Sequence, residues 1–164
     1  MSIIATGMSS AIPKLAKDGS NFEQWRDAME LFAQSINAAC ILNGSTPRPE
    51  DGVSIINDNY MDPSPAPTFT ASTTTAERTA VLKEYNEAEK AREEFNKSIK
   101  ARAKEAREAL DRYLTKEGQL KLVIMNTVNR DMYETVRHQD LVSNQFSSII
   151  ARYKEKGLNE KCSI

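Results

Sequence analysis

Apolar residues recur at three- and four-residue steps along most of this chain, which is the spacing of amphipathic helices. Before the first run, Ser20 and Glu23 have the spacing of a capping box, so a helix should start near residue 21. It should end at Gly44, because glycine readily adopts the left-handed conformation that closes a helix. The pattern predicts a helix over about 21–42. Its apolar positions are Phe22, Trp25, Met29, Phe32, Ile36, Ala39 and Cys40.

The next segment, 45–75, contains five of the six prolines and ends in a run rich in Ser, Thr and Pro. Such a composition has too few apolar side chains to offset the entropy lost on ordering. We expect a long flexible loop after the first helix.

Helical spacing returns after this segment and continues to the end of the chain. We expect a long, Ala-rich helix over 76–114, two short helices after Gly118, and a last helix over 140–156 with Asp140 as its cap and Gly157 as its end. The long helix carries its apolar side chains along one side, at Val81, Tyr85, Ala88, Phe95, Ile99, Ala106, Leu110 and Tyr113.

No strand-like alternation competes with these helices, so the predicted fold class is all-α. The expected architecture is a small bundle of about four to five helices. A flexible N-terminus (1–11) precedes a single domain (12–157), and a C-terminal tail (158–164) follows it.

Composition and charge narrow the function classes. The chain is 40% hydrophobic and 27% charged, with a formal net charge of -1. Residues 1–75 carry 4 Lys/Arg against 8 Asp/Glu, and residues 76–164 carry 18 against 15. This asymmetry suits head-to-tail contact between copies, but it falls short of the basic surplus of a dedicated nucleic-acid-binding domain.

The residues that usually carry chemistry are scarce. A single histidine, His138, cannot assemble a multi-histidine metal site, and the six glycines are isolated, so no phosphate-binding loop is present. Cys40 is expected in the core, and Cys162 is one position too close to the end for prenylation. We therefore expect a non-enzymatic protein with no catalytic residue, metal, cofactor or small-molecule substrate.

The chain has no apolar run near the roughly 18 residues that cross a bilayer. We expect a cytoplasmic protein that does not bind membranes.

Two features of the long helix leave alternatives open. One flank carries a basic ridge that consists of Lys97, Lys100, Lys104 and Arg107. This ridge would allow weak RNA binding, although its interpretation as a solvated face is favoured. The apolar stripe would suit a coiled-coil adaptor, but Arg92 and Arg102 interrupt its heptad positions, so packing within the molecule is favoured.

One cluster contains Gly19, Asn21, Phe22 and Trp25, and a second contains Phe146, Ile149 and Tyr153. These two clusters resemble the opening and the later part of the N-terminal capsid region in copia-type retrotransposon Gag polyproteins. The opening motif of that family has a Gly, an Asn, an aromatic and a Trp, then a Met, and a Gly before prolines. The later motif keeps apolar and aromatic residues at fixed spacing. The matching positions are Gly19, Asn21, Phe22, Trp25, Met29, Phe32, Gly44, Phe146, Ile149 and Tyr153.

The resemblance covers roughly 12–157 and departs from the family pattern at two places. Leu15 lies four residues before Gly19 where the family usually has two, and Ala39 stands where a second Trp is common. The resemblance implies a helical capsid lobe, from a truncated or domesticated Gag, that associates with itself or with other Gag-like chains into virus-like particles. In the family, RNA is contacted mainly by other regions, among them a zinc knuckle.

Overall fold

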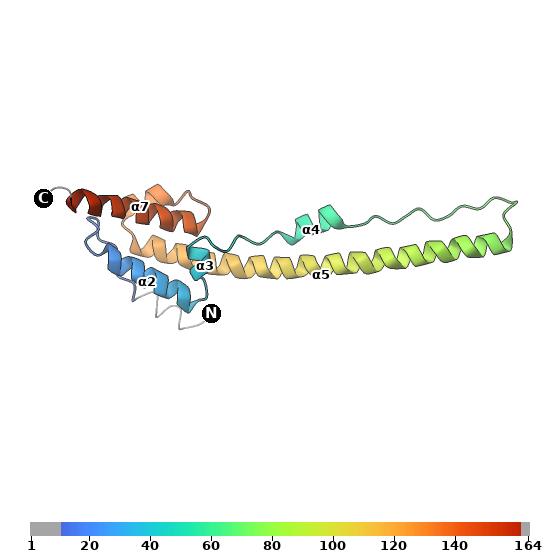
Figure 1. The fold of residues 1–164 in the computed structure, drawn as a ribbon, viewed down its shortest axis with the longest axis horizontal. Coiled ribbons are helices and arrows are strands. Elements are labelled where there is room, and N and C mark those ends of the chain that lie inside the picture. The colour runs from blue at the N-terminus through green and yellow to red at the C-terminus, as the bar shows by residue number, and fades with distance from the viewer. Residues whose placement is uncertain (1–10, 162–164) are drawn as a thin grey trace. The chain divides into compact units, whose positions relative to one another are not determined.

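The fold comes from a computed structural model that describes residues 11–161, with side chains described as far as residue 156 (Figure 1). Every regular element in the described chain is a helix, which confirms the all-α class. Contacts group the chain into two compact units. Unit 1 combines the residues up to Arg48 with those from Asp111 onward, and unit 2 is Pro49–Leu110. Residues 1–10 of the predicted flexible N-terminus, and Cys162, lie outside the described residues.

Unit 1 begins with two helices where the sequence predicted one. Helix α2 spans Phe22–Ser35 and α3 spans Ala39–Leu42. Between them Asn37 adopts a left-handed φ of 55°, and the Ala38 N–H bonds to the Ala33 carbonyl at 2.7 Å. Asparagine tolerates this conformation better than most residues. The single helix predicted over 21–42 is therefore wrong, although the end at Gly44, with a φ of 79°, is confirmed.

The break in this region changes which side chains are buried. Ile41 and Leu42 are buried after the turn, at 7% and 2% exposure. Cys40 is exposed instead, so its prediction as a core residue is wrong. The turn rotates α3 relative to a continuous helix, and this places its two larger aliphatic side chains in the core.

The C-terminal part of unit 1 also differs from the prediction at its glycines. Helix α5 spans Thr75–Thr127 and passes through Gly118 without a break, so the end predicted at 114 is wrong. Helix α6 spans Arg130–Val136, and α7 spans Val142–Lys161, beyond the end predicted at Gly157. An interior glycine costs a helix about 1 kcal/mol, which is less than the burial of a single large apolar side chain nearby contributes. Leu120 and Ile124, both 0% exposed, supply such burial after Gly118.

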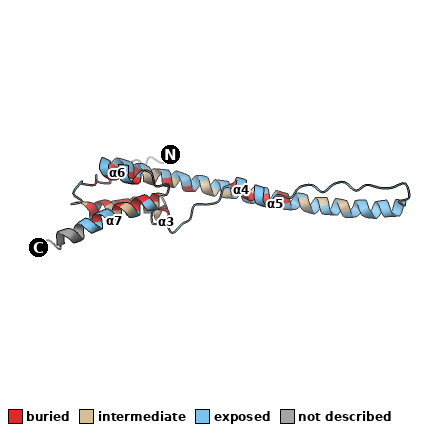
Figure 2. Cartoon of the chain, turned by 90° about the horizontal axis from the view of Figure 1, so that it is seen from above, coloured by how far each residue is buried: buried red, intermediate tan, exposed pale blue. Residues whose placement is uncertain are grey.

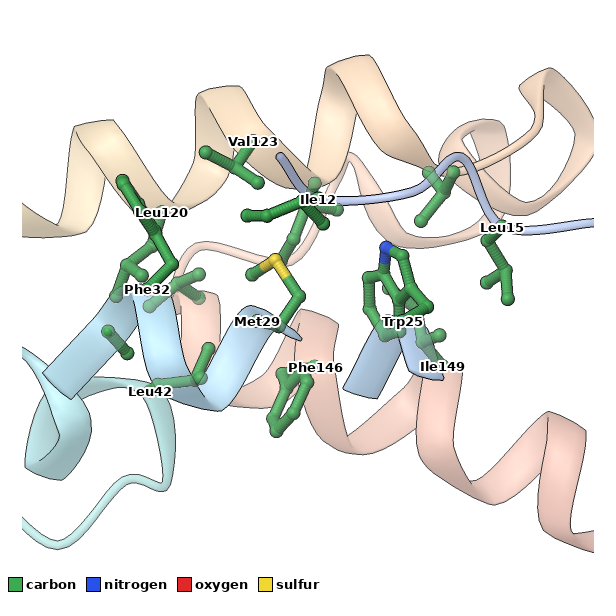
Figure 3. Packing of buried hydrophobic residues seen from close by; sticks show 14 of the residues in the cluster. Ile12, Leu15, Trp25, Met29, Phe32, Leu42, Leu120, Val123, Phe146 and Ile149 are labelled. Atoms are coloured by element: carbon green, nitrogen blue, oxygen red, sulfur yellow. The ribbon is translucent and has the colours of Figure 1, made fainter. Parts of the chain in front are cut away.

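The core of unit 1 draws on α2, α3, the end of α5, α6 and α7 (Figure 3). Its most enclosed large side chains include Trp25, Met29, Leu120, Ile124 and Ile149, each 0% exposed. Trp25 also donates its Nε1–H to the Thr127 hydroxyl at 2.9 Å. This core therefore joins the beginning of the described chain to its last two helices.

Unit 2 consists of the first part of α5 and the segment before it, which was predicted to be a flexible loop. This segment contains a helix that was not predicted, α4 (Gly52–Asn59), whose first turn is capped by the Asp51 carboxylate. A Cβ on Gly52 would lie 2.4 Å from the Ala103 carbonyl oxygen, so only glycine allows α4 to approach α5 this closely. Ile55 packs there against Ile99 and Ala103.

The extended residues after α4 bond to α5 through a buried amide. Asn96, 4% exposed, accepts the Met61 N–H at 2.9 Å and donates to the Met61 carbonyl at 2.8 Å. Phe95, predicted on the packed side of the long helix, is 43% exposed. The backbone of an extended segment needs hydrogen-bond partners, which an amide supplies and a phenyl ring does not.

A capping box at Thr74 and Glu77 starts α5.

Candidate functional site

The residues of the family-like opening motif shape a tight turn before α2. The Asn21 side chain accepts the Ala16 N–H at 2.8 Å and donates to the Lys14 carbonyl at 2.7 Å. The capping box predicted at Ser20 is not formed, because the Ser20 N–H bonds to the Asp18 carboxylate at 3.0 Å and Asn21 makes no side-chain cap. The Ser20 backbone N–H lowers the pKa of Asp18. Asn21 therefore organises the chain that precedes the helix.

The two family-like clusters, separated by more than a hundred residues in sequence, meet in the core of unit 1. Phe22 stacks on Tyr153 with ring centroids 5.4 Å apart. Trp25 lies 5.9 Å from Phe146 in a tilted arrangement. Figure 3 shows Trp25, Phe146 and Ile149 in the same cluster as Met29 and Phe32. These side chains are core residues, and none of them presents a reactive group to solvent.

Both motif glycines lie where a side chain would be obstructed. Gly19 has a φ of 79°, and a Cβ there would lie 2.5 Å from the Tyr153 ring. Gly44 has the same φ, and its Cβ would lie 3.2 Å from that of Ser143. The two glycines thus bring the turns at either end of the α2–α3 region against α7. Their role is close packing.

A shallow hollow of about 330 Å³ adjoins the Gly19 turn, with Asp18, Ser20, Glu23 and Lys156 on its rim. The Lys156 ammonium lies 5.4 Å above the Tyr153 ring. The hollow carries charges of both signs, and its carboxylate at Asp18 already accepts a backbone N–H. The arrangement offers no nucleophile paired with a base.

A buried carboxylate, Glu117 on α5, was not identified from the sequence. Its side chain is 3% exposed. One oxygen accepts from Arg48 at 2.9 Å and lies 3.6 Å from Lys121. The other accepts the Tyr113 hydroxyl and the Val142 N–H, both at 3.4 Å. All its acceptor positions face protein donors, so the cluster is structural.

The cluster around Glu117 also changes the pKa values of neighbouring side chains. Arg48 also bonds to Asp140 at 2.9 Å, which lowers the pKa of Asp140 and, together with Glu117, raises the pKa of Arg48. Burial, followed by the Glu117 charge, raises the pKa of Tyr113. Asp140 was predicted to cap the last helix, and it forms this ion pair instead. No pattern in the sequence indicates which of the many carboxylates Arg48 selects.

The predicted basic ridge lies in unit 2. Its members, Lys97, Lys100, Lys104 and Arg107, are all exposed on α5. The Lys100 ammonium lies 5.6 Å from the Tyr60 ring centroid. The ridge is thus accessible to a polyanion.

His138, the histidine of the sequence analysis, is exposed. Among the side chains described, those of residues 11–156, no three from His, Cys, Asp or Glu gather as metal ligands. None of the described helices has the length and apolarity to cross a bilayer.

Unit 1 exposes an apolar stripe along α5. Leu114, Leu122 and Met125 are 44%, 52% and 43% exposed, and their spacing places them on one flank of the helix. Gly118 lies between them, and a Cβ there would meet nothing within 4 Å. We call these four residues the α5 stripe. Exposed apolar side chains grouped in this way are typical of protein interaction surfaces.

Comparisons of the chain with protein-family models, with curated proteins and with solved structures found no match.

Proposed function

We propose that unit 1 is a Gag-like capsid lobe of the copia type, from a truncated or domesticated Gag, which works as a structural protein by associating with further copies in the cytoplasm. The observation that carries the proposal is the meeting of the two family-like clusters in one core. Phe22 and Trp25 come from the opening motif, and they pack on Tyr153 and Phe146 from the later motif. Two motifs that belong to one capsid lobe are expected to pack together, as these do.

The surface most suited to this association is the α5 stripe. Each exposed leucine or methionine that becomes fully buried contributes about 1 kcal/mol, so three side chains support a weak contact and not a permanent one. Weak contacts repeated between many copies are what a reversible assembly needs. A residue without a side chain at Gly118 leaves room for a neighbouring chain to approach.

Light scattering behind size-exclusion chromatography on the full chain, across protein concentration and salt, tests this function. We expect assemblies larger than dimers at high concentration, and we expect Leu122→Glu to abolish them. Leu31→Glu is the matched control, because Leu31 is also exposed, at 61%, but lies on α2 outside the stripe. A chain that stays monomeric or dimeric at every concentration would contradict the proposal.

The salt series separates this function from RNA binding by the basic ridge. RNA binding through several lysines falls steeply with salt, because counterions are released from the phosphates. Association through an apolar stripe should change little. Tight RNA binding that disappears when Lys97 and Lys104 are both replaced by Glu would favour an RNA-binding function instead.

A further inference from the structure

The outer side of α5 in unit 2 has a face that nothing in that unit covers. The packed side of this helix carries Asn96, Ile99 and Ala103. About a quarter of a turn away, exposed residues recur at alternating three- and four-residue steps, the spacing of a coiled-coil contact line. In Figure 2 much of this part of α5 has the pale blue of exposed residues. We call this line the α5 seam, and its members are Glu84, Ala88, Ala91, Phe95, Ser98 and Arg102.

The seam combines one large exposed aromatic with small neighbours. Phe95 is 43% exposed, and Ala91 and Ser98 lie one turn to either side of it. A helix that packs here needs a small residue opposite Phe95 and a large residue opposite Ala91. The seam supplies both to a second copy of itself.

Charge along the helix decides the direction of such a pair. Residues 77–94 carry six Glu against four Lys or Arg, whereas residues 97–107 carry five Lys or Arg against one Glu. A parallel pair would set Arg102 against Arg102 and Glu84 against Glu84. An antiparallel pair sets the acidic stretch of one copy against the basic stretch of the other, so like charges are separated.

We infer that two copies of this chain pair antiparallel along the α5 seam, with Phe95 of each copy against Ala91 of the other. This register places Ala88 opposite Ser98 and Glu84 opposite Arg102, and the two-fold symmetry repeats each contact. Arg102, which interrupts an apolar heptad, here acts as the partner of a carboxylate. Among the ion pairs of the described residues, none uses Glu84 or Arg102, so both are available.

The pair is a closed two-fold contact, and it goes beyond the proposed function without depending on it. A two-fold interface alone produces dimers. The α5 stripe of unit 1 would then join dimers into larger assemblies. Each interface can be removed while the other remains, so the two proposals fail separately.

Charge reversal with rescue is the sharpest test, performed on the full chain with Leu122→Glu to remove association through unit 1. Glu84 and Arg102 are separated by about 27 Å along one helix, at 1.5 Å a residue, so they cannot pair within a copy. Glu84→Arg alone and Arg102→Glu alone each set like charges together twice. Each should raise the dimer midpoint concentration about tenfold in analytical ultracentrifugation. The double variant should restore the dimer.

A matched control uses the same charge changes on the far side of α5. Glu93→Arg combined with Arg107→Glu should leave the dimer unchanged, because both positions point away from the seam. Circular dichroism checks that the helix remains. Single reversals without effect, a double variant no better than the singles, or a monomer up to the highest soluble concentration would each overturn the proposal.

Cross-linking tests the direction of the pair. In a background with Cys40→Ser and Cys162→Ser, Glu94→Cys lies next to the symmetry axis and should link two copies through a short bismaleimide. Ala101→Cys, one heptad later on the same side, is about 24 Å from its symmetry mate in this register and should not link. Equal linking at both positions would indicate a parallel pair and contradict the proposal.

Discussion

Replacing Gly19 by alanine tests whether the turn before α2 and the last helix are locked together as the structure describes. The substitution adds a single methyl group in unit 1 and changes no charge. Gly19 lies in the turn, and its missing Cβ would point at the Tyr153 ring 2.5 Å away. The effect therefore depends on two separate quantities, the backbone conformation and the space available.

The expected loss of stability follows from both quantities. A φ of 79° costs a residue with a Cβ about 1–2 kcal/mol. The Tyr153 ring cannot move freely, because it stacks on Phe22 and its hydroxyl accepts from the Asn129 amide at 3.0 Å. Overpacking at such a site costs about 1–3 kcal/mol. Together they predict a loss of about 3 kcal/mol in the free energy of unfolding.

Urea unfolding followed by tryptophan fluorescence measures this loss. Trp25 is the only tryptophan, is 0% exposed, and reports on the unit 1 core that contains Tyr153. Gly118→Ala is the matched control, because this glycine is inside a helix and its Cβ would meet nothing within 4 Å. The control should stabilise unit 1 by about 1 kcal/mol.

Gly19→Ala should lower the free energy of unfolding and Gly118→Ala should raise it, so the two measurements together can refute the reasoning. If Gly19→Ala changed the free energy of unfolding by less than about 1 kcal/mol, the strained turn and its contact with Tyr153 would not exist in solution. If Gly118→Ala destabilised as much as Gly19→Ala, the continuous α5 would be wrong.

Three further predictions concern polar groups in unit 1. Thr127→Val leaves the Trp25 indole N–H buried without its acceptor, so unfolding by urea should lose about 1–3 kcal/mol, whereas Thr127→Ser should lose less. Arg48→Ala removes the closest cation from Glu117 and should lower the free energy of unfolding by about 2 kcal/mol, whereas Arg48→Lys should lower it less. If both variants were as stable as the parent, the buried pair would be contradicted. Because Arg48 lowers the pKa of Asp140, that ion pair stabilises unit 1 fully above the ordinary pKa of 3.8 and its contribution disappears as pH falls through the lowered value. In Arg48→Ala, NMR titration should show the pKa of Asp140 back near its ordinary value, and an unchanged pKa would refute the contact.

Side-chain periodicity was enough to predict most of the helical segments, although not α4 or the break at Asn37. The apolar positions of the first helix are buried as expected, from Phe22 to Phe32, because an amphipathic stripe has one side that water disfavours. The end at Gly44 follows from the backbone freedom of glycine alone. The motif positions Trp25 and Tyr153 were identified on spacing, and both are in one core.

Positions where a local preference competes with burial could not be predicted from the sequence. Gly118 and Gly157 resemble helix ends, yet α5 and α7 pass through both, because each glycine costs only about 1 kcal/mol and buried neighbours such as Leu120 contribute more. At Asn37, by contrast, the helix does end, since a short left-handed turn there allows Leu42 to reach the core.

Only the tertiary structure decided which polar groups are buried and which apolar groups face water. Asn96 is inside and Phe95 outside because the extended backbone at Met61 needs two hydrogen bonds. Glu117 is enclosed because Arg48, distant in sequence, reaches it. Such choices depend on pairs of residues brought together by the fold. The sequence alone therefore determined the all-α class and most of the helical segments, whereas the breaks between helices, the short helix α4 and the partners of each side chain were determined by packing.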